Sequence, residues 1–201
     1  MPGAEFRSAG PLILSSDYPA VIGRDGAFYF SRFTDRLRIM RITPDGTQSV
    51  HVTLPATSQR WLNGLTAAPD GSLYYTENRA VRKIDARGVI TTIVDGVSVA
   101  NCTSIPGTTA EVGPYLRGLA VAPDGTIYVA ASGCAALLKI ARGHVTPTLR
   151  IRAPWSPTAV AIANGELYVL EYLHTASDDR REWIPRVRKI ARDGTQVMLT
   201  K

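Results

Sequence analysis

The sequence predicts an all-β protein, a β-propeller built from four-stranded antiparallel blades. Three observations support this fold class. One phrase recurs four times and is clearest at residues 116–130, each copy carries two glycine turns, and the segments between the turns are rich in Val, Ile, Tyr and Thr. Because no stretch shows apolar residues at helical spacing, we expect strands throughout.

The turn glycines align the four copies. The first turn of each copy is Asp-Gly or Asn-Gly and contains Gly26, Gly71, Gly125 and Gly165. The second turn contains Gly46, Gly88, Gly143 and Gly194. Asp-Gly and Asn-Gly pairs between alternating apolar runs are strong hairpin signals, because they tolerate the positive φ of a tight turn. The first-turn glycines lie 45, 54 and 40 residues apart, close to the roughly 40 to 50 residues of a blade.

This spacing predicts blades at about residues 18–55, 61–95, 116–152 and 156–201, with an insertion at 95–115. Residues 1–17 are expected to form an N-terminal arm or the outer strand of an absent blade. Propellers contain about 4 to 8 blades, so four could close a ring. However, every copy already has four strands, so residues 11–15 have no incomplete blade to join. A partial propeller is therefore favoured, and a homo-oligomer in which two partial rings complete each other is a further possibility.

Composition fits a globular β domain. The chain is 45% hydrophobic, with 17 Gly and 13 Pro residues, which provides for both a core and many turns. No apolar run suggests a membrane span, and the first residues do not resemble a secretion signal.

The long insertions are expected on one face of the propeller. Residues 95–115 and 174–183 lie in connections that emerge opposite the glycine turns. We call this the funnel face, and we call the opposite side the glycine-turn face. Extra loops on one side of a repeat array often mark its binding side, although they could also simply cover an edge. The glycine-turn face is expected to be tight.

Aromatic residues recur where the chain enters the inner strands. Trp61, Tyr115 and Trp155 each precede their turn glycine by ten residues. Such side chains can wedge between blades and bury apolar area, which is the favoured role. Alternatively, they form part of an aromatic ring at the mouth, suited to stacking on a sugar or another flat ligand.

Polar residues at the ends of the inner and second strands are the other candidates for the mouth. These are Asn63, Glu77, Arg117 and Glu171. Carboxylates with an amide oxygen could hold a hard cation such as calcium. Because the guanidinium of Arg117 would repel a cation, pairing between arginine and glutamate on neighbouring blades is favoured.

Several phrases carry a resemblance to known families. Residues 81–93 and 118–130 resemble NHL repeats, and residues 62–77 are similar to the gluconolactonase and senescence-marker-protein propellers. The lactonase group of this superfamily carries a divalent metal in the central channel, held by Glu, Asn and Asp side chains. Only Asn63 falls on such a position here, since Tyr18, Arg117 and Pro157 occupy the corresponding ones.

The resemblance implies two functions. The favoured one is an NHL-type recognition scaffold that binds a small molecule, glycan or protein on its funnel face and requires no cofactor. The alternative is a divalent-metal-dependent hydrolase of the lactonase type, with calcium or zinc at Asn63, Glu77 and Glu171. No residue is assigned a catalytic role.

The two cysteines are both expected on the funnel face. Cys102 lies in the insertion, and Cys134 lies between the second and third strands of the third blade. A disulfide between them would pin the insertion and would imply an oxidising, extracytoplasmic compartment. Two free thiols are the alternative.

The net charge is +6. A base recurs in each third strand, immediately before an isoleucine: Arg41, Lys83, Lys139 and Lys189. Charges that repeat with the blade are spread around the ring, where they favour solubility and edge protection over a nucleic-acid groove. Nucleic acid is therefore not expected as a partner.

Overall fold

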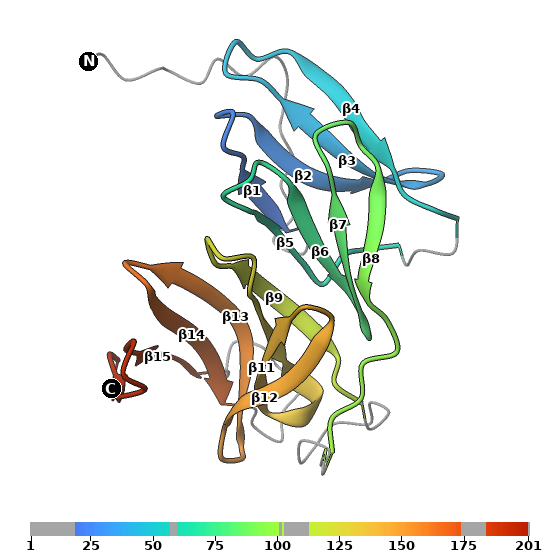
Figure 1. Cartoon of the computed structure of the whole chain (residues 1–201). Helices are drawn as coiled ribbons and strands as arrows, with labels where there is room; N and C mark the ends of the chain where they lie inside the picture. The colour runs from blue at the N-terminus through green and yellow to red at the C-terminus, as the bar shows by residue number, and fades with distance from the viewer. Residues whose placement is uncertain (1–18, 57–59, 101, 103–112, 174–183, 201) are drawn as a thin grey trace, which may run out of the picture.

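The computed structural model describes residues 19–56, 60–100, 102, 113–173 and 184–200. It contains four antiparallel sheets of four strands each (Figure 1). The first blade consists of β1 (Ala20–Ile22), β2 (Phe28–Phe33), β3 (Leu37–Ile42) and β4 (Gln48–Thr53). The second consists of β5 (Gly64–Ala67), β6 (Leu73–Glu77), β7 (Ala80–Ile84) and β8 (Ile90–Val94).

The third and fourth blades repeat this arrangement. The third blade consists of β9 (Leu116–Val121), β10 (Ile127–Ala131), β11 (Ala136–Ala141) and β12 (His144–Arg150), with the short 3-10 helix η1 (Ser132–Cys134) between β10 and β11. The fourth consists of β13 (Trp155–Ala163), β14 (Glu166–Leu173), β15 (Ile184–Ile190) and β16 (Gln196–Met198). Strands within each sheet follow sequence order, so every blade is an up-and-down meander and the predicted fold class is confirmed.

The glycine turns have the backbone that their sequence predicts. Gly71 and Gly125 have φ of +85° and +81°. A Cβ at either position would meet nothing within 4 Å, so the left-handed backbone, and not crowding, requires glycine there.

Three core clusters join the four blades in series. One lies between the first and second blades and includes Ile39 and Tyr75. The next lies between the second and third blades, and the last lies between the third and fourth blades. Among the described residues no such cluster joins the fourth blade to the first. The blades accordingly follow one another in an open arc in Figure 1, which fits the predicted partial propeller.

Inner strands of neighbouring blades meet through glycine. A Cβ on Gly64 in β5 would lie 2.6 Å from the carbonyl oxygen of Arg117 in β9. A Cβ on Gly118 in β9 would lie 2.7 Å from the Cα of Ala159 in β13. Both neighbours are backbone atoms, so the close approach of these strands requires the absence of a side chain.

Three of the four repeated bases of the third strands have a structural partner. Arg41 pairs with Asp25 at 2.7 Å, Lys83 with Asp70 at 2.8 Å and Lys189 with Glu166 at 3.1 Å. Each of these carboxylates lies in or beside the first turn of its own blade. The base therefore ties the third strand to the first hairpin, a role beyond the solubility predicted from its spacing.

Three regions of the sequence analysis fall wholly or partly outside the described residues. They are the N-terminal arm at 1–17, the loop between β14 and β15 at 174–183, and residues 101 and 103–112 of the insertion. No helix in the described ranges is long and apolar enough to cross a membrane.

Candidate functional site

Glu171 lies at the funnel end of β14 and is fully buried. Its Oε2 accepts hydrogen bonds from Arg186 Nε at 2.6 Å and from Arg188 Nη2 at 3.4 Å. Its Oε1 accepts one from Arg188 Nε at 2.6 Å. The guanidinium of Arg186 also lies over the ring of Trp155, 3.7 Å from the centroid. Both oxygens of this carboxylate are therefore occupied by arginines of the adjacent strand, β15.

Glu77 occupies the same place in the second blade. Its Oε2 accepts a hydrogen bond from Arg82 Nε at 2.8 Å, and Arg82 also pairs with Asp95 at 3.3 Å. Glu77 Oε1 is buried and has no hydrogen-bond partner among the described residues. The pairing predicted between Arg117 and glutamates of neighbouring blades is wrong, because each glutamate pairs with an arginine of its own blade.

The third blade replaces this pair with apolar residues. Counted from the turn glycine, the third blade has Ala131 in place of Glu77. The cross-strand registers place Leu138 where the second blade has Arg82. Both third-blade residues are fully buried. The glutamate and arginine of the second and fourth blades thus stand at a position that a neighbouring blade fills by apolar packing.

Asn63 joins a group of backbone and amide contacts at the mouth. Its side-chain nitrogen donates to Asn78 Oδ1 at 3.4 Å. The Asn78 carbonyl accepts a hydrogen bond from the backbone N–H of Leu116 at 2.9 Å. Asn78, in the short turn between β6 and β7, therefore sits between the inner strands of the second and third blades. Sequence reasoning missed it, although an asparagine in a two-residue turn on this face was the available signal.

Arg117 lies in β9, which leads down from the mouth. Its carbonyl oxygen accepts a hydrogen bond from Thr76 Oγ1 at 2.7 Å, so its backbone is fixed against the second blade. The residue is partly exposed.

The three aromatic residues at the strand entries divide into two groups. Trp61 is 51% exposed and Tyr115 is 41% exposed, so the favoured role of wedging between blades is wrong for both. Trp155 is partly buried and packs against the cluster between the third and fourth blades. Trp61 and Tyr115 therefore present aromatic surface at the entries of two neighbouring inner strands, β5 and β9.

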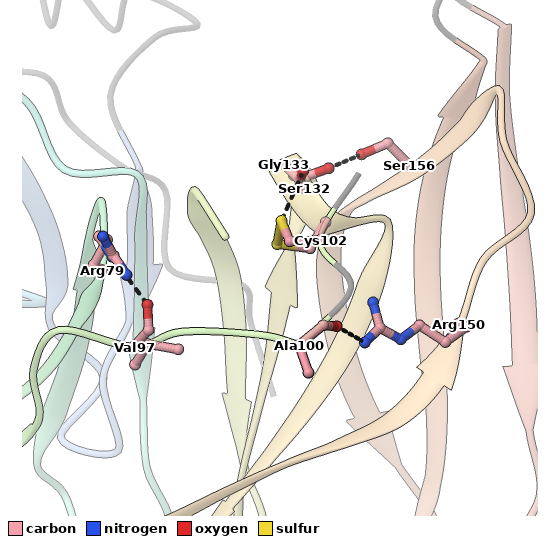
Figure 2. Close-up of a disulfide and its surroundings, with 9 residues drawn as sticks. Arg79, Val97, Ala100, Cys102, Ser132, Gly133, Arg150 and Ser156 are labelled. Atoms are coloured by element: carbon pink, nitrogen blue, oxygen red, sulfur yellow. Dashed lines mark hydrogen bonds between the residues drawn. A yellow bond between two sulfur atoms is a disulfide. The ribbon is translucent and has the colours of Figure 1, made fainter. Parts of the chain in front are cut away.

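The insertion after β8 is held across the funnel face by several contacts (Figure 2). Arg79 Nε donates to the Val97 carbonyl at 3.0 Å, and Arg150 Nη2 donates to the Ala100 carbonyl at 2.5 Å. A disulfide joins Cys102 to Cys134 in η1, with a Cα–Cα distance of 4.6 Å. The beginning of the insertion is thus attached to both the second and third blades.

The turn η1 also contacts the fourth blade. Ser156 Oγ donates to the Ser132 carbonyl at 2.8 Å, and Ser132 Oγ donates in return to the Pro157 carbonyl. Ser132 and Ser156 are both buried. One turn therefore links the disulfide-held insertion to the inner strand β13.

Most of the oxygens predicted to bind a metal have other partners among the described residues. Both oxygens of Glu171 are bound by arginines, and Glu77 forms an ion pair with Arg82. Among the described residues the side chain of Asn63 hydrogen-bonds to Asn78 and to neither glutamate. Within the part of the chain that the structure describes, no group of three or more His, Cys, Asp or Glu side chains is placed to hold a metal ion.

Comparison with known proteins supports the fold. No protein-family model and no curated protein matches the sequence. A catalytically inactive virginiamycin B lyase from Staphylococcus aureus, in a structure with quinupristin, is similar at 19% identity and a TM-score of 0.64, over 93% of this chain and 56% of the lyase. A gluconolactonase from Xanthomonas campestris is similar at 18% identity and a TM-score of 0.61, over 91% of this chain and 62% of the enzyme.

A third similar structure is the calcium-binding protein regucalcin from Agrobacterium tumefaciens, at 14% identity and a TM-score of 0.56, over 81% of this chain and 55% of regucalcin. The chain thus spans little more than half the length of these proteins. The arrangement of the four blades and these likenesses lead to one conclusion: the chain has the β-propeller fold shared by the gluconolactonase-like proteins and the streptogramin B lyases.

Proposed function

We propose that this propeller is a recognition module that binds a glycan or another flat small molecule at the mouth of its funnel face. The observation that carries the proposal is the exposure of Trp61 and Tyr115 at the entries of two adjacent inner strands. Aromatic rings usually bury most of their surface, and an exposed pair on a rigid scaffold offers a stacking platform.

Polar groups beside the platform supply directional contacts. The amides of Asn63 and Asn78 can both donate and accept hydrogen bonds, as recognition of sugar hydroxyls requires. Their backbones are fixed by hydrogen bonds to β6 and β9. Arg117 adds a positive charge in the neighbouring strand.

The state of Glu171 also favours recognition over hydrolysis. A carboxylate that activates water or binds a metal needs an accessible oxygen. Glu171 has none, because it is fully buried and bound by two arginines. The carboxylate of Glu171 therefore stabilises the fourth blade and does not serve chemistry at the mouth.

The test is binding to an array of neutral oligosaccharides, followed by calorimetric titration with the best-bound glycan. We expect Trp61→Ala and Tyr115→Ala each to weaken binding about tenfold or more, since stacking with desolvation contributes over 1 kcal/mol. Ile22→Ala is the matched control, because Ile22 is 63% exposed beside the first glycine turn, on the opposite face. No glycan binding by the native protein, or equal effects of all three substitutions, would overturn the proposal.

One observation favours a second function, that of a metal-dependent lactonase-type hydrolase. Glu77 Oε1 is buried without a partner among the described residues, and a buried acceptor of this kind invites a ligand. Titration with calcium or zinc in the presence of a lactone tests this alternative. Saturable metal binding with turnover, both lost on Glu77→Gln, supports it, whereas native protein that neither binds the metals nor hydrolyses the lactone excludes it.

A further inference from the structure

A cavity of about 620 Å³ lies on the glycine-turn face, between the first and second blades. The prediction that this face is tight is wrong at this junction. The cavity walls come from six segments: the strands β2, β3 and β4, the turn between β1 and β2, the turn between β5 and β6, and the turn between β7 and β8. Its lining includes Arg24, Arg41, His51 and Arg87, with Asp25 as the one acidic residue.

The junction around the cavity is held by contacts between the blades. Arg24 Nη1 donates to the carbonyl of Pro69 in the facing turn. A Cβ on Gly88 would lie 3.1 Å from the carbonyl oxygen of His51, so the second turn of the second blade packs closely on β4. The walls are therefore contributed by packed segments of two described blades.

The positive charges of the lining are not all neutralised. Arg41 donates to Asp25 Oδ2 from Nε at 3.1 Å and from Nη2 at 2.7 Å, so these two charges compensate each other. Arg87 lies 3.5 Å from Asp85, and its side chain is 85% exposed. Among the described residues Arg24 donates to a backbone carbonyl, which carries no net charge. Within the lining itself no carboxylate balances Arg24 and Arg87, and the partner of Arg87 is Asp85, which lies outside the lining.

Equivalent positions at the next two junctions have a different character. Two residues before the first-turn glycine, Arg24 is replaced by Pro69 and then Pro123. One residue before the second-turn glycine of the following blade, Arg87 is matched by Arg142 and then by Asp193. Arg24 and Arg87 therefore occur together only at the first of the three junctions between described blades.

His51 completes this distinction. It is the extra residue at the register shift where β4 pairs with β3. The corresponding bulge residues are Ile93 in β8 and Thr148 in β12. A bulge redirects a side chain relative to its neighbours. At this junction the redirected residue is an imidazole in edge-to-face contact with Tyr29, with ring centroids 5.2 Å apart.

We propose that this cavity binds a small phosphate ester, with Arg24 and Arg87 contacting the phosphate and the rings of Tyr29 and His51 beside its organic part. A planar guanidinium matches two phosphate oxygens at once, and such charge-assisted hydrogen bonds are the strong ones. The cavity volume lies within the roughly 300 to 1,000 Å³ of small-molecule sites. This site is on the opposite face from the proposed glycan platform and does not depend on it.

Calorimetric titration of the full chain with phenyl phosphate, at constant ionic strength, tests the proposal. We expect saturable binding of one equivalent, weakened about tenfold or more by Arg87→Gln, because a hydrogen bond to a charged group contributes about 1.5 to 3 kcal/mol. Arg24→Gln should act in the same direction. Arg142→Gln removes the same charge from the equivalent turn of the third blade and should leave the affinity unchanged.

Two further results separate a built site from general attraction. The variant His51→Thr introduces the residue found at the bulge of the third blade, so it is expected to fold. It should weaken the binding of phenyl phosphate more than the binding of inorganic phosphate. Equal weakening by Arg87→Gln and Arg142→Gln would show diffuse attraction to a basic protein and would overturn the proposal. Absence of saturable binding to native protein would also overturn it.

Discussion

Glu171 illustrates how a charged residue becomes part of a propeller core. Its carboxylate is fully buried, yet each oxygen accepts a short hydrogen bond from an arginine on the adjacent strand. Removing one partner of such a buried group leaves the others uncompensated, which costs more than the intact network contributes. The identity of residue 171 therefore matters for stability.

For Glu171→Gln we expect a loss of about 3 to 5 kcal/mol in the free energy of unfolding, because Arg186 and Arg188 would remain largely covered without their negative partner. Urea unfolding followed by circular dichroism measures it. Arg192→Gln, which alters an exposed side chain of the same blade, is the control. Equal midpoints for the two variants would contradict the assigned role.

The pair of Glu77 and Arg82 allows a test that uses the protein's own repeat. The third blade has alanine and leucine at these positions, and both are fully buried there. We expect the double variant Glu77→Ala with Arg82→Leu to be more stable than Glu77→Ala alone. The single variant leaves Arg82 without its partner, whereas the double variant has the two apolar residues that pack at these positions in the third blade. Denaturant unfolding of the native protein, the single variant and the double variant measures this difference. A double variant less stable than the single variant would refute the structural equivalence of these positions in the second and third blades.

His51 gives a pH dependence of stability with a definite sign. Burial, and then the charge of Arg41, lower the pKa of His51 below its ordinary 6.5, although Asp25 and Asp85 oppose this shift. Below about pH 6.5 the unfolded chain therefore takes up a proton that the folded chain resists, so the stability contributed by neutral His51 is lost as pH falls.

In His51→Thr this contribution is absent. The difference in unfolding free energy between native protein and variant should therefore change between pH 7 and pH 5, with the native protein losing more. Thermal unfolding at a series of pH values measures it. A difference that does not vary with pH would show that His51 has an ordinary pKa in the folded state.

At the scale of the elements, the strands and glycine turns could be predicted because they depend on short-range patterns. Asp-Gly pairs, alternating apolar residues and a regular spacing each report local backbone geometry, and all four predicted blades have their four strands. The partners of Glu77 and Glu171 were predicted wrongly, because they depend on which face of a strand each side chain occupies. That parity follows from the register, which places Arg186 opposite Glu171.

The candidate sites were less predictable for the same reason. Spacing identified Trp61 and Tyr115 as residues at strand entries but could not tell whether their rings were covered by a neighbouring blade. The cavity beside His51 depends on a bulge in β4, and a bulge changes the direction of one side chain without a strong sequence signal. Differences between the copies, and not their shared pattern, carry these features.

The inner strands provide a prediction about close packing. Gly118→Ala places a Cβ where the backbone of Ala159 lies 2.7 Å away, so one strand must move. We expect a loss of at least about 1 to 3 kcal/mol, as for other overpacked sites, measured by denaturant unfolding. Leu119 is the neighbouring core residue, and Leu119→Met, which nearly conserves volume, is the control. An unchanged midpoint for Gly118→Ala would mean that the inner strands are farther apart than described.

The disulfide between Cys102 and Cys134 closes a loop with a sequence separation of 32. The loop-entropy relation gives about 3 to 4 kcal/mol for this length. We expect the double variant Cys102→Ala with Cys134→Ala to lower the unfolding free energy by up to that amount. Reductant should lower the unfolding free energy of the native protein and leave that of the double variant unchanged. Two thiols that react with an alkylating agent in the native, non-reduced protein would contradict the bridge.

For the whole molecule, four blades in series separate two faces with different properties. The funnel face presents Trp61 and Tyr115 beside paired amides, and its insertion is attached by hydrogen bonds and a disulfide. The glycine-turn face carries the repeated pairs of base and carboxylate, together with the basic cavity at the first junction. Because the blades are hydrogen-bonded meanders joined by three apolar clusters, ligand contacts on either face would be made by a preformed surface.

The central claim is that the funnel mouth recognises its ligand by aromatic stacking and does so without a divalent metal. Titration of the native protein with its best-bound oligosaccharide, in the presence and absence of EDTA, tests it most directly, with Trp61→Ala beside it. The account predicts equal affinity under both conditions and a loss of about tenfold or more for Trp61→Ala. Binding that disappears with EDTA, and that Trp61→Ala leaves unchanged, would contradict it.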